Sequence, residues 1–213
     1  MTPVLLVTGF EPFGAHKANP SEELARAVDG RRFGDAIVQG LVLPVHHRDA
    51  ALTLVARLVE VDPTAVLHLG LAEGRARIAL ERVALNVLDY PIPDNAGCQA
   101  VDQPCAPEGP AAYFSTLPLR AMLAALTAEG IPAYVSNTAG TFLCNQTLYA
   151  TRHAIERRGL RARAGFVHLP LLPSMVAASG LEQPSMDLPL MLRAVEVALT
   201  VIASPVTPEP ARG

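Results

Sequence analysis

Three residues of this sequence have the types and positions of a nucleophile, a base and an orienting carboxylate. The first, Cys144, follows a turn at 137–141 and stands where a helix is predicted to begin. Helix N-termini present unpaired amide donors and the positive end of the helix dipole, which lower the pKa of a thiol and can hold an oxyanion. Free cysteines also commonly pack in a core without any reactivity, so position alone leaves both interpretations open.

The second residue, His168, stands near the end of a predicted strand at 165–169. Its ring is expected at the carboxyl edge of a sheet, where ligands bind in open α/β folds. Only a helix and a strand separate it from Cys144, so the imidazole could lie beside the thiol and accept its proton. The alternative is a histidine held by a structural hydrogen bond.

The third residue, Glu81, interrupts the apolar face of a predicted strand at 78–87. A buried carboxylate is costly unless it is paired, so Glu81 needs a cationic or hydrogen-bonding partner. If that partner is His168, the three residues make the nucleophile, base and orienter of a cysteine hydrolase. If it is Arg75 or Arg77, Glu81 makes a plain ion pair.

The elements that must position these residues alternate along the chain. Apolar runs predict strands at 4–7, 36–43, 65–69, 78–87, 133–135 and 165–169, and amphipathic stretches predict helices at 20–28, 49–61, 118–129, 143–158 and 187–203. We therefore predict an α/β fold, a single-domain three-layer α/β/α sandwich around a mostly parallel, twisted sheet, over residues 1–204. Residues 205–213 are expected to form a disordered tail.

Composition excludes several classes of protein. The chain has 213 residues, of which 50% are hydrophobic and 17% charged, so it folds. Its 17 Lys and Arg against 20 Asp and Glu give a net charge of -3, without the cationic excess that nucleic-acid binding needs. No apolar run is long enough for a membrane span, and residues 1–10 lack the basic start of a signal peptide. We expect a cytoplasmic protein with no nucleic-acid or membrane partner.

The region 89–110 has too many prolines and glycines for a regular element, and long loops of this kind are often functional. Asp94 in this loop is a lesser candidate for the acidic member of the site, because an aspartate before Asn-Ala-Gly is typical of a turn. The loop also holds Cys98 and Cys105, which could pair with each other but are expected as thiols. Three cysteines are too few, and odd in number, for a disulfide framework.

A metal site is not predicted. Cys98 and Cys105 have no CxxC or histidine pair nearby, so zinc binding is poorly supported. His16 is isolated, and His46 and His47 are adjacent residues that would point to opposite faces of a strand. The hydrolase chemistry described above also needs no cofactor.

A set of motifs surrounds the three residues. They are TGFEPFG at 8–14 with NPS at 19–21, GRARIALERVALN at 74–86, SNTAGTFLCN at 136–145 and GFVHLP at 165–170. In type and order these motifs resemble the pyroglutamyl-peptidase I (pyrrolidone carboxyl peptidase) family of cysteine peptidases.

The resemblance implies an enzyme that removes N-terminal pyroglutamate from small peptides through a thioester, and a homotetramer. It implies Cys144 as nucleophile, His168 as general base and Glu81 as its orienter. Four further residues are implied to bind the substrate: Phe10, Phe13, Asn19 and Phe142. A pyroglutamyl ring has no charged amine, so apolar walls with a few polar partners suit it. Phe10 and Phe13 stand in a glycine-flanked loop after a strand, which argues against an ordinary core role.

Two positions depart from the family pattern. Pro91 replaces an arginine in the family's Asp-x-Arg-Ile-Pro-Asp-Asn motif, and Leu71 replaces a glutamine that is common after Gly70. Two other functions are alternatives to a peptidase. A nucleoside phosphorylase would need a phosphate loop or a basic cluster, and none of the usual form occurs. For a catalytically inactive binding module, the change at Pro91 is the only indication.

Overall fold

The computed structural model describes residues 2–180 and 182–204. Its strands are β1 (Val4–Phe10), β2 (Arg32–Phe33), β3 (Ala36–Leu43), β4 (Ala65–Leu71), β5 (Ile78–Glu81), β6 (Val83–Leu85), β7 (Ala112–Phe114), β8 (Ala133–Ser136) and β9 (Arg163–Leu169). Its helices are α1 (Pro20–Val28), α2 (His47–Val61), α3 (Leu119–Ala128), α4 (Leu143–Arg158), α5 (Pro173–Ser179) and α6 (Leu188–Ala203). The tail predicted at 205–213 lies outside the described residues.

Seven of the strands form one sheet, in the order β2-β3-β1-β4-β9-β5-β8, while β6 and β7 pair separately. Strands β3, β1, β4 and β9 are all parallel. Strand β2 runs antiparallel to β3, and β5 runs antiparallel to β9 but parallel to β8. The predicted α/β fold with a mostly parallel sheet is confirmed.

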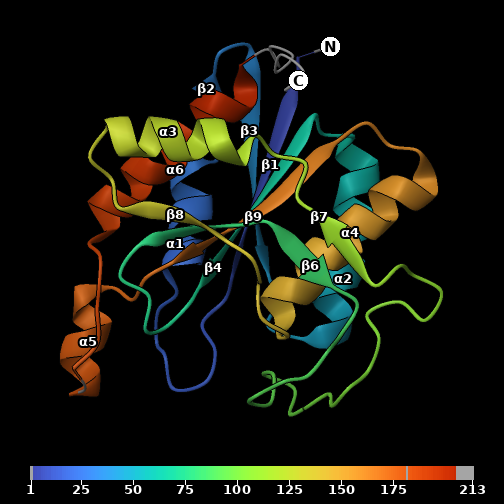
Figure 1. The fold of residues 1–213 in the computed structure, drawn as a ribbon, viewed down its shortest axis with the longest axis horizontal. Coiled ribbons are helices and arrows are strands. Elements are labelled where there is room, and N and C mark those ends of the chain that lie inside the picture. The colour runs from blue at the N-terminus through green and yellow to red at the C-terminus, as the bar shows by residue number, and fades with distance from the viewer. Residues whose placement is uncertain (1, 181, 205–213) are drawn as a thin grey trace, which may run out of the picture.

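Helices cover both faces of this sheet (Figure 1). Apolar side chains of α1, α3 and α6 pack into one core cluster, and those of α2 and α4 pack into a second cluster on the opposite face. Neighbouring residues of a strand alternate between the two, because successive side chains point to opposite faces. In β9, Val167 belongs to the first cluster and Phe166 to the second. His168 and Glu81 therefore point to the face that α4 covers.

Local sequence signals explain where the helices that flank the site begin and end. Asn19 caps α1, and its side chain accepts a hydrogen bond from the backbone N–H of Ser21. Helix α4 stops at Gly159, which adopts the left-handed conformation that favours glycine, with φ of 63°. The bounds predicted for α1, β3 and α4 agree with the structure.

Several local predictions were wrong. The strand predicted at 78–87 breaks after Glu81, because the chain leaves the large sheet there and β6 pairs with β7 instead. The short elements β2, β7 and α5 were not predicted, since two to seven residues carry little periodicity. The region 89–110 contains no helix and no named strand, as expected. Among the described residues, no helix is long and apolar enough to cross a membrane.

Candidate active site

Glu81 and His168 meet on one face of the sheet, on the adjacent antiparallel strands β5 and β9. The Nδ1 atom of His168 lies 2.8 Å from Oε1 of Glu81. The guanidinium of Arg75 donates to the same oxygen at 2.6 Å. The side chain of Glu81 is 0% exposed and that of His168 only 5%. Of the three partners considered from the sequence, Glu81 therefore pairs with His168 and Arg75. The third, Arg77, stacks on the ring of Tyr134 instead.

The surroundings of this pair keep the carboxylate charged and the imidazole neutral. Burial alone would raise the pKa of Glu81, but the hydrogen bond with His168, together with Ser136 and Arg75, outweighs burial and lowers the pKa. Burial lowers the pKa of His168, and Arg75 acts in the same direction, while Glu81 opposes both. With Nδ1–H donated to Glu81, the Nε2 atom of a neutral His168 is left as an acceptor.

Cys144 is the second residue of α4, on the same face of the sheet as His168. Residue Phe142 occupies the N-cap of α4 without any side-chain hydrogen bond to the helix, so the first amides of α4 are not capped by a side chain. The Sγ atom lies over Gly70, where an added Cβ would come within 3.0 Å of it. Gly70 pairs with His168 in the register of β4 and β9. Because Gly70 has no side chain, the thiol of Cys144 can approach strand β4 beside His168.

The thiol of Cys144 is half-buried and protonated at neutral pH. Burial and the negative charge of Glu81 raise the pKa of Cys144 to about 12, with Arg75 opposing them. The sequence had indicated a lowered thiol pKa from the helix terminus alone, and that expectation is overturned by the burial. A base must therefore remove the proton before the sulfur can attack.

A small cavity opens beside Cys144. It is lined by Phe10, Phe13, Asn19, Val45, Leu71, Phe142, Leu143 and Cys144. All four residues implied as substrate-binding from the resemblance are among them, and none of the lining side chains carries a charge. Phe10 is nevertheless the last residue of β1 and 97% buried, rather than part of the loop expected from the sequence.

Asn19 lines this cavity and also makes hydrogen bonds that hold its wall in place. Its Oδ1 accepts hydrogen bonds from the N–H and the hydroxyl of Ser21, and its Nδ2 donates to the backbone carbonyl of Glu11 at 3.1 Å. These bonds tie the start of α1 to the loop that carries Phe13. One hydrogen of Nδ2 is left over, because an amide nitrogen carries two.

Residues on the loop after β6 also support the cavity. The ring of Tyr90 packs edge-on against Phe142 with centroids 4.7 Å apart, and its hydroxyl donates to the side chain of Gln146 in α4. Burial raises the pKa of Tyr90, so the hydroxyl keeps its proton. Asn145 of α4 holds the backbone of Leu85 and Val87. The first turn of α4 is thereby fixed to its surroundings.

A buried histidine also links helix α4 to the sheet. His68 of β4 is fully buried, and its Nδ1 lies 2.8 Å from the hydroxyl of Thr8 in β1. Its Nε2 lies 2.9 Å from the hydroxyl of Thr151 in α4. Burial lowers the pKa of His68 to about 3, so the ring is neutral. No local pattern in the sequence indicates this link, because its three members are far apart along the chain.

Asp94 does not join Glu81 and His168. Its carboxylate accepts hydrogen bonds from the backbone N–H groups of Ala96, Cys98 and His47. These bonds belong to a turn, which is the alternative that the sequence favoured. Of the two departures from the family pattern, Leu71 lines the cavity and makes its wall apolar, whereas Pro91 is exposed.

The two adjacent histidines lie differently from what the sequence suggested. His46 caps α2, its Nδ1 accepting from the N–H groups of Arg48 and Asp49, and His47 is the first residue of the helix. Their rings stack with centroids 5.3 Å apart, so they do not point to opposite faces of a strand. One ligand atom each from His46, His47 and Asp94 lie within 4.8 Å of one another. The expectation that the side chains of His46 and His47 point to opposite faces was therefore wrong.

Sequence reasoning missed three contributors to the site. Gly70 and Tyr90 were not singled out, although a glycine ending an apolar strand is the signal of close backbone approach. Val45 lines the cavity because β3 runs beside β1, which only the order of the sheet decides.

Comparison with known proteins identifies the family. The pyroglutamyl peptidase family matches residues 4–205. A pyrrolidone-carboxylate peptidase of Pyrococcus furiosus is 44% identical over 200 residues, covering 92% of this chain and 96% of that protein. One from an Enterobacter species is 45% identical over 197 residues, covering 92% and 91%.

Solved structures agree with this assignment. The crystal structure of the pyrrolidone carboxyl peptidase from Pyrococcus furiosus and its Cys-free mutant superposes with a TM-score of 0.91 at 44% identity, covering 93% of this chain and 97% of that one. The similarity thus extends over the fold and over nearly the whole length. This chain belongs to the pyroglutamyl peptidase family and is a peptidase, a hydrolase.

Proposed function

We propose that this protein is a cysteine exopeptidase that removes N-terminal pyroglutamate from small peptides, with Cys144 as nucleophile, His168 as general base and Glu81 as the residue that orients it. The observation that carries the proposal is the uncharged cavity that opens on the Cys144 thiol. The names of the related peptidases support the choice of substrate.

The reaction begins from a neutral thiol and a neutral imidazole. Nε2 of His168 takes the proton of Cys144 as the sulfur attacks the pyroglutamyl carbonyl carbon, which gives a tetrahedral intermediate and an imidazolium. Glu81 stabilises that imidazolium through the 2.8 Å hydrogen bond to Nδ1. His168, Ser136 and Arg75 keep the carboxylate ionised. Glu81 therefore fixes the tautomer of the neutral ring and the orientation of the imidazolium that forms.

The remaining steps use the same groups. Backbone amides at the start of α4, which lack a side-chain cap, stabilise the oxyanion of the intermediate. His168 then protonates the leaving amine and a thioester forms on Cys144. Water activated by His168 hydrolyses the thioester and releases pyroglutamate. No step requires a metal or a cofactor.

The cavity accounts for the choice of pyroglutamate. The rings of Phe10, Phe13 and Phe142 and the side chain of Leu71 offer apolar walls to the lactam ring. The free hydrogen of Asn19 Nδ2 is a donor for the lactam carbonyl. A protonated N-terminal amine would lose its hydration in this cavity without meeting a counter-ion, since none of the lining side chains is acidic.

A pair of reporter amides tests the proposal. The purified protein is expected to cleave a pyroglutamyl reporter amide at least about a hundredfold faster, in kcat/KM, than the prolyl analogue. The prolyl ring has the same size but lacks the lactam carbonyl, so it leaves the donor unpaired and brings in a charged amine. Initial rates at low substrate concentration measure the ratio. Near-equal rates would refute the pyroglutamate pocket.

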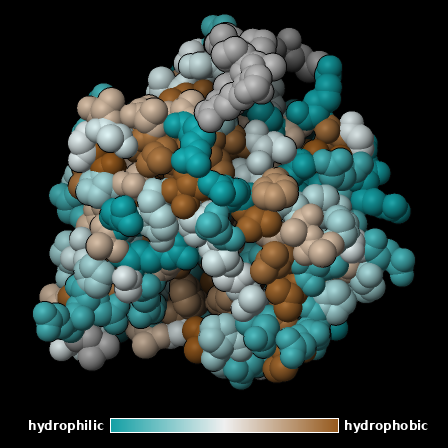
Figure 2. Space-filling model, viewed as in Figure 1, coloured by the Kyte–Doolittle hydropathy of each residue, from teal (hydrophilic) through white to brown (hydrophobic). Residues whose placement is uncertain are grey.

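The proposal includes a homotetramer in the cytoplasm, as the resemblance implies. Exposed apolar side chains support association: Phe114 in β7 is 66% exposed, and Val101 in the loop that precedes β7 is 63% exposed. Figure 2 shows hydrophobic residues at the surface over this part of the molecule. Three free cysteines accord with a reducing compartment. Light scattering at several protein concentrations tests the oligomeric state.

A further inference from the structure

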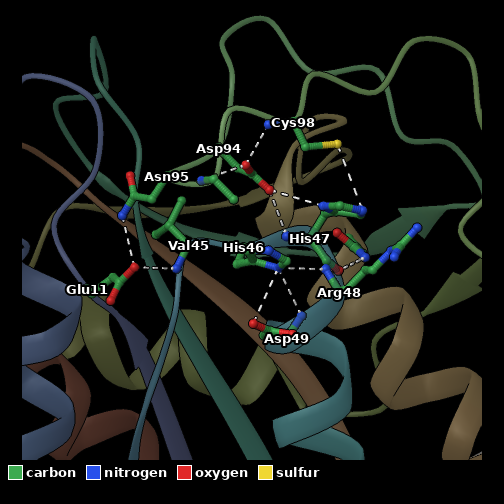
Figure 3. A network of polar contacts seen from close by, with 11 residues as sticks. Glu11, Val45, His46, His47, Arg48, Asp49, Asp94, Asn95 and Cys98 are labelled. Atoms are coloured by element: carbon green, nitrogen blue, oxygen red, sulfur yellow. Dashed lines mark hydrogen bonds and ion pairs between the residues drawn. The ribbon is translucent and has the colours of Figure 1, made fainter.

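A second cluster of cysteine, histidine and carboxylate lies away from the cavity, where the 89–110 loop meets the start of α2 (Figure 3). The Sγ atom of Cys98 lies 3.8 Å from Nε2 of His47. The Nδ1 atom of the same ring lies 3.2 Å from Oδ2 of Asp94. The imidazole therefore stands between the thiol and the carboxylate, with one nitrogen directed to each.

The carboxylate of this cluster is fixed and ionised. Three backbone N–H groups donate to it, from His47, Ala96 and Cys98, at 2.9 to 3.0 Å. Burial would raise the pKa of Asp94, but these hydrogen bonds lower it overall. A fixed carboxylate that accepts from Nδ1 leaves Nε2 as the acceptor that faces the sulfur. It also stabilises the imidazolium that forms when the ring takes the thiol proton.

The other thiol of the loop has different surroundings. Cys105 is also half-buried, but its sulfur lies against the carbonyl oxygens of Leu85 and Val87 at 3.6 Å, which are acceptors and cannot take its proton. Burial raises the pKa of Cys105 to about 12. Cys98 is half-buried as well and the ring of His47 is 24% exposed, so a small reagent can reach the thiol.

We propose that Cys98 is a modification site, a reactive thiol that His47 and Asp94 activate for exchange with low-molecular-weight disulfides. His47 takes the proton from Cys98, and the sulfur attacks one sulfur of the disulfide. A new S–S bond forms as the old one breaks, and the departing thiolate takes the proton from His47. One thiol and one disulfide give one mixed disulfide and one thiol, so no other oxidant is needed.

The cluster is connected to the walls of the cavity. Gln146 of α4, two residues after Cys144, donates to the backbone carbonyl of His47 at 2.6 Å. Asn95, next to Asp94, donates to the side chain of Glu11 and the carbonyl of Pro12. A mixed disulfide on Cys98 places a new group beside His47, whose backbone carbonyl Gln146 holds. Modification of this surface thiol is therefore expected to weaken substrate binding without touching the nucleophile.

The experiment uses the full chain carrying Cys144→Ala, which removes the cavity thiol. This protein is mixed with hydroxyethyl disulfide at pH 7.5 beside N-acetylcysteine, and mass spectrometry of peptides follows the mixed disulfide on each cysteine. Cys98 is expected to react about tenfold faster than N-acetylcysteine, and Cys105 to remain unmodified over the same time. Reaction of Cys98 no faster than N-acetylcysteine would overturn the proposal.

Two further variants separate activation from simple exposure. His47→Gln is expected to slow the reaction of Cys98 about tenfold, because no base remains beside the thiol. His46→Asn is the matched control: it removes the neighbouring imidazole but keeps a residue that caps α2, and it should leave the rate unchanged. An unchanged rate in folded His47→Gln would overturn the proposal. If that variant does not fold, the comparison with N-acetylcysteine decides alone.

Discussion

The same three types of residue occur in two clusters of this protein, and their surroundings give them different properties. In the cluster on the sheet, Glu81, His168 and Cys144 lie on two strands and a helix, and the side chains of Glu81 and His168 are at most 5% exposed. In the loop cluster of Asp94, His47 and Cys98, the histidine is 24% exposed and the cysteine lies on irregular chain. The cysteine of the first cluster lines the cavity described above, whereas no residue of the loop cluster is among the residues that line it.

The difference shows what an enzyme site needs beyond its residue types. The sheet holds Glu81 and His168 in fixed register, and the start of α4 presents amides beside the thiol. The cavity then brings a substrate carbonyl to that thiol. The loop cluster has a proton acceptor for its thiol, but its residues do not line that cavity and its cysteine does not stand at a helix start. We therefore expect peptide hydrolysis from the first cluster and simple thiol chemistry from the second.

Removal of each thiol is the strongest test of this comparison. Cys144→Ala is expected to lower kcat for a pyroglutamyl reporter amide by at least about a thousandfold, since no other group can form the thioester. Cys98→Ala and Cys105→Ala should keep most of the activity. Equal losses in the three variants would mean that the two clusters do not differ in the way described.

Exchange of each carboxylate for its amide should separate catalysis from stability. Glu81→Gln is expected to lower kcat by at least about a hundredfold, because the amide cannot stabilise an imidazolium. Asp94→Asn should leave kcat nearly unchanged but lower the free energy of unfolding by about 1 to 3 kcal/mol, because three backbone donors lose a charged acceptor. Kinetics and urea unfolding of both variants measure this. A larger fall in kcat for Asp94→Asn would reverse the assignment of the acidic residue.

Gly70→Ala tests how closely the thiol must approach the strand. The new Cβ would lie 2.6 Å from the ring of Phe166 and 3.0 Å from Sγ of Cys144, so something must shift. We expect kcat/KM to fall about tenfold, with a destabilisation of about 1 to 3 kcal/mol. Gly40→Ala is the control, because its Cβ would meet a carbonyl of α1 at 2.4 Å, away from Cys144. Similar kcat/KM values in the two variants would show that the approach at Gly70 is not needed.

The smallest expected effect is on the pH profile. The pKa of His168 is lowered from its ordinary value of 6.5, so the neutral base persists below that pH and is lost only as the pH falls through the lower value in the folded protein. The acid limb of kcat/KM for the free enzyme should have its midpoint below pH 6.5. Circular dichroism at each pH must show folded protein, because protonation of buried His68 favours unfolding in acid. A midpoint above 6.5 would contradict the neutral, buried imidazole.

The sequence by itself determined the secondary structure that carries the site and the identity of the candidate residues. Apolar runs, an N-cap asparagine and a closing glycine were enough to place β3, α1 and α4, because these signals act within a few residues. The motif around Cys144 likewise placed the thiol at the start of a helix. The same local signals could not show where β5 ends, since the break at Glu81 depends on pairing between β6 and β7.

Only the tertiary structure decided how these residues act. The order of the sheet puts β9 between β4 and β5, and this brings Gly70 beside His168 and His168 beside Glu81. Burial in that arrangement raises the pKa of the Cys144 thiol, the opposite of what its helix position alone indicated. Packing of the 89–110 loop on α2 likewise brought His47 to Cys98, 51 residues away. Contacts between distant segments depend on the fold of the whole chain, and short patterns of residues do not encode them.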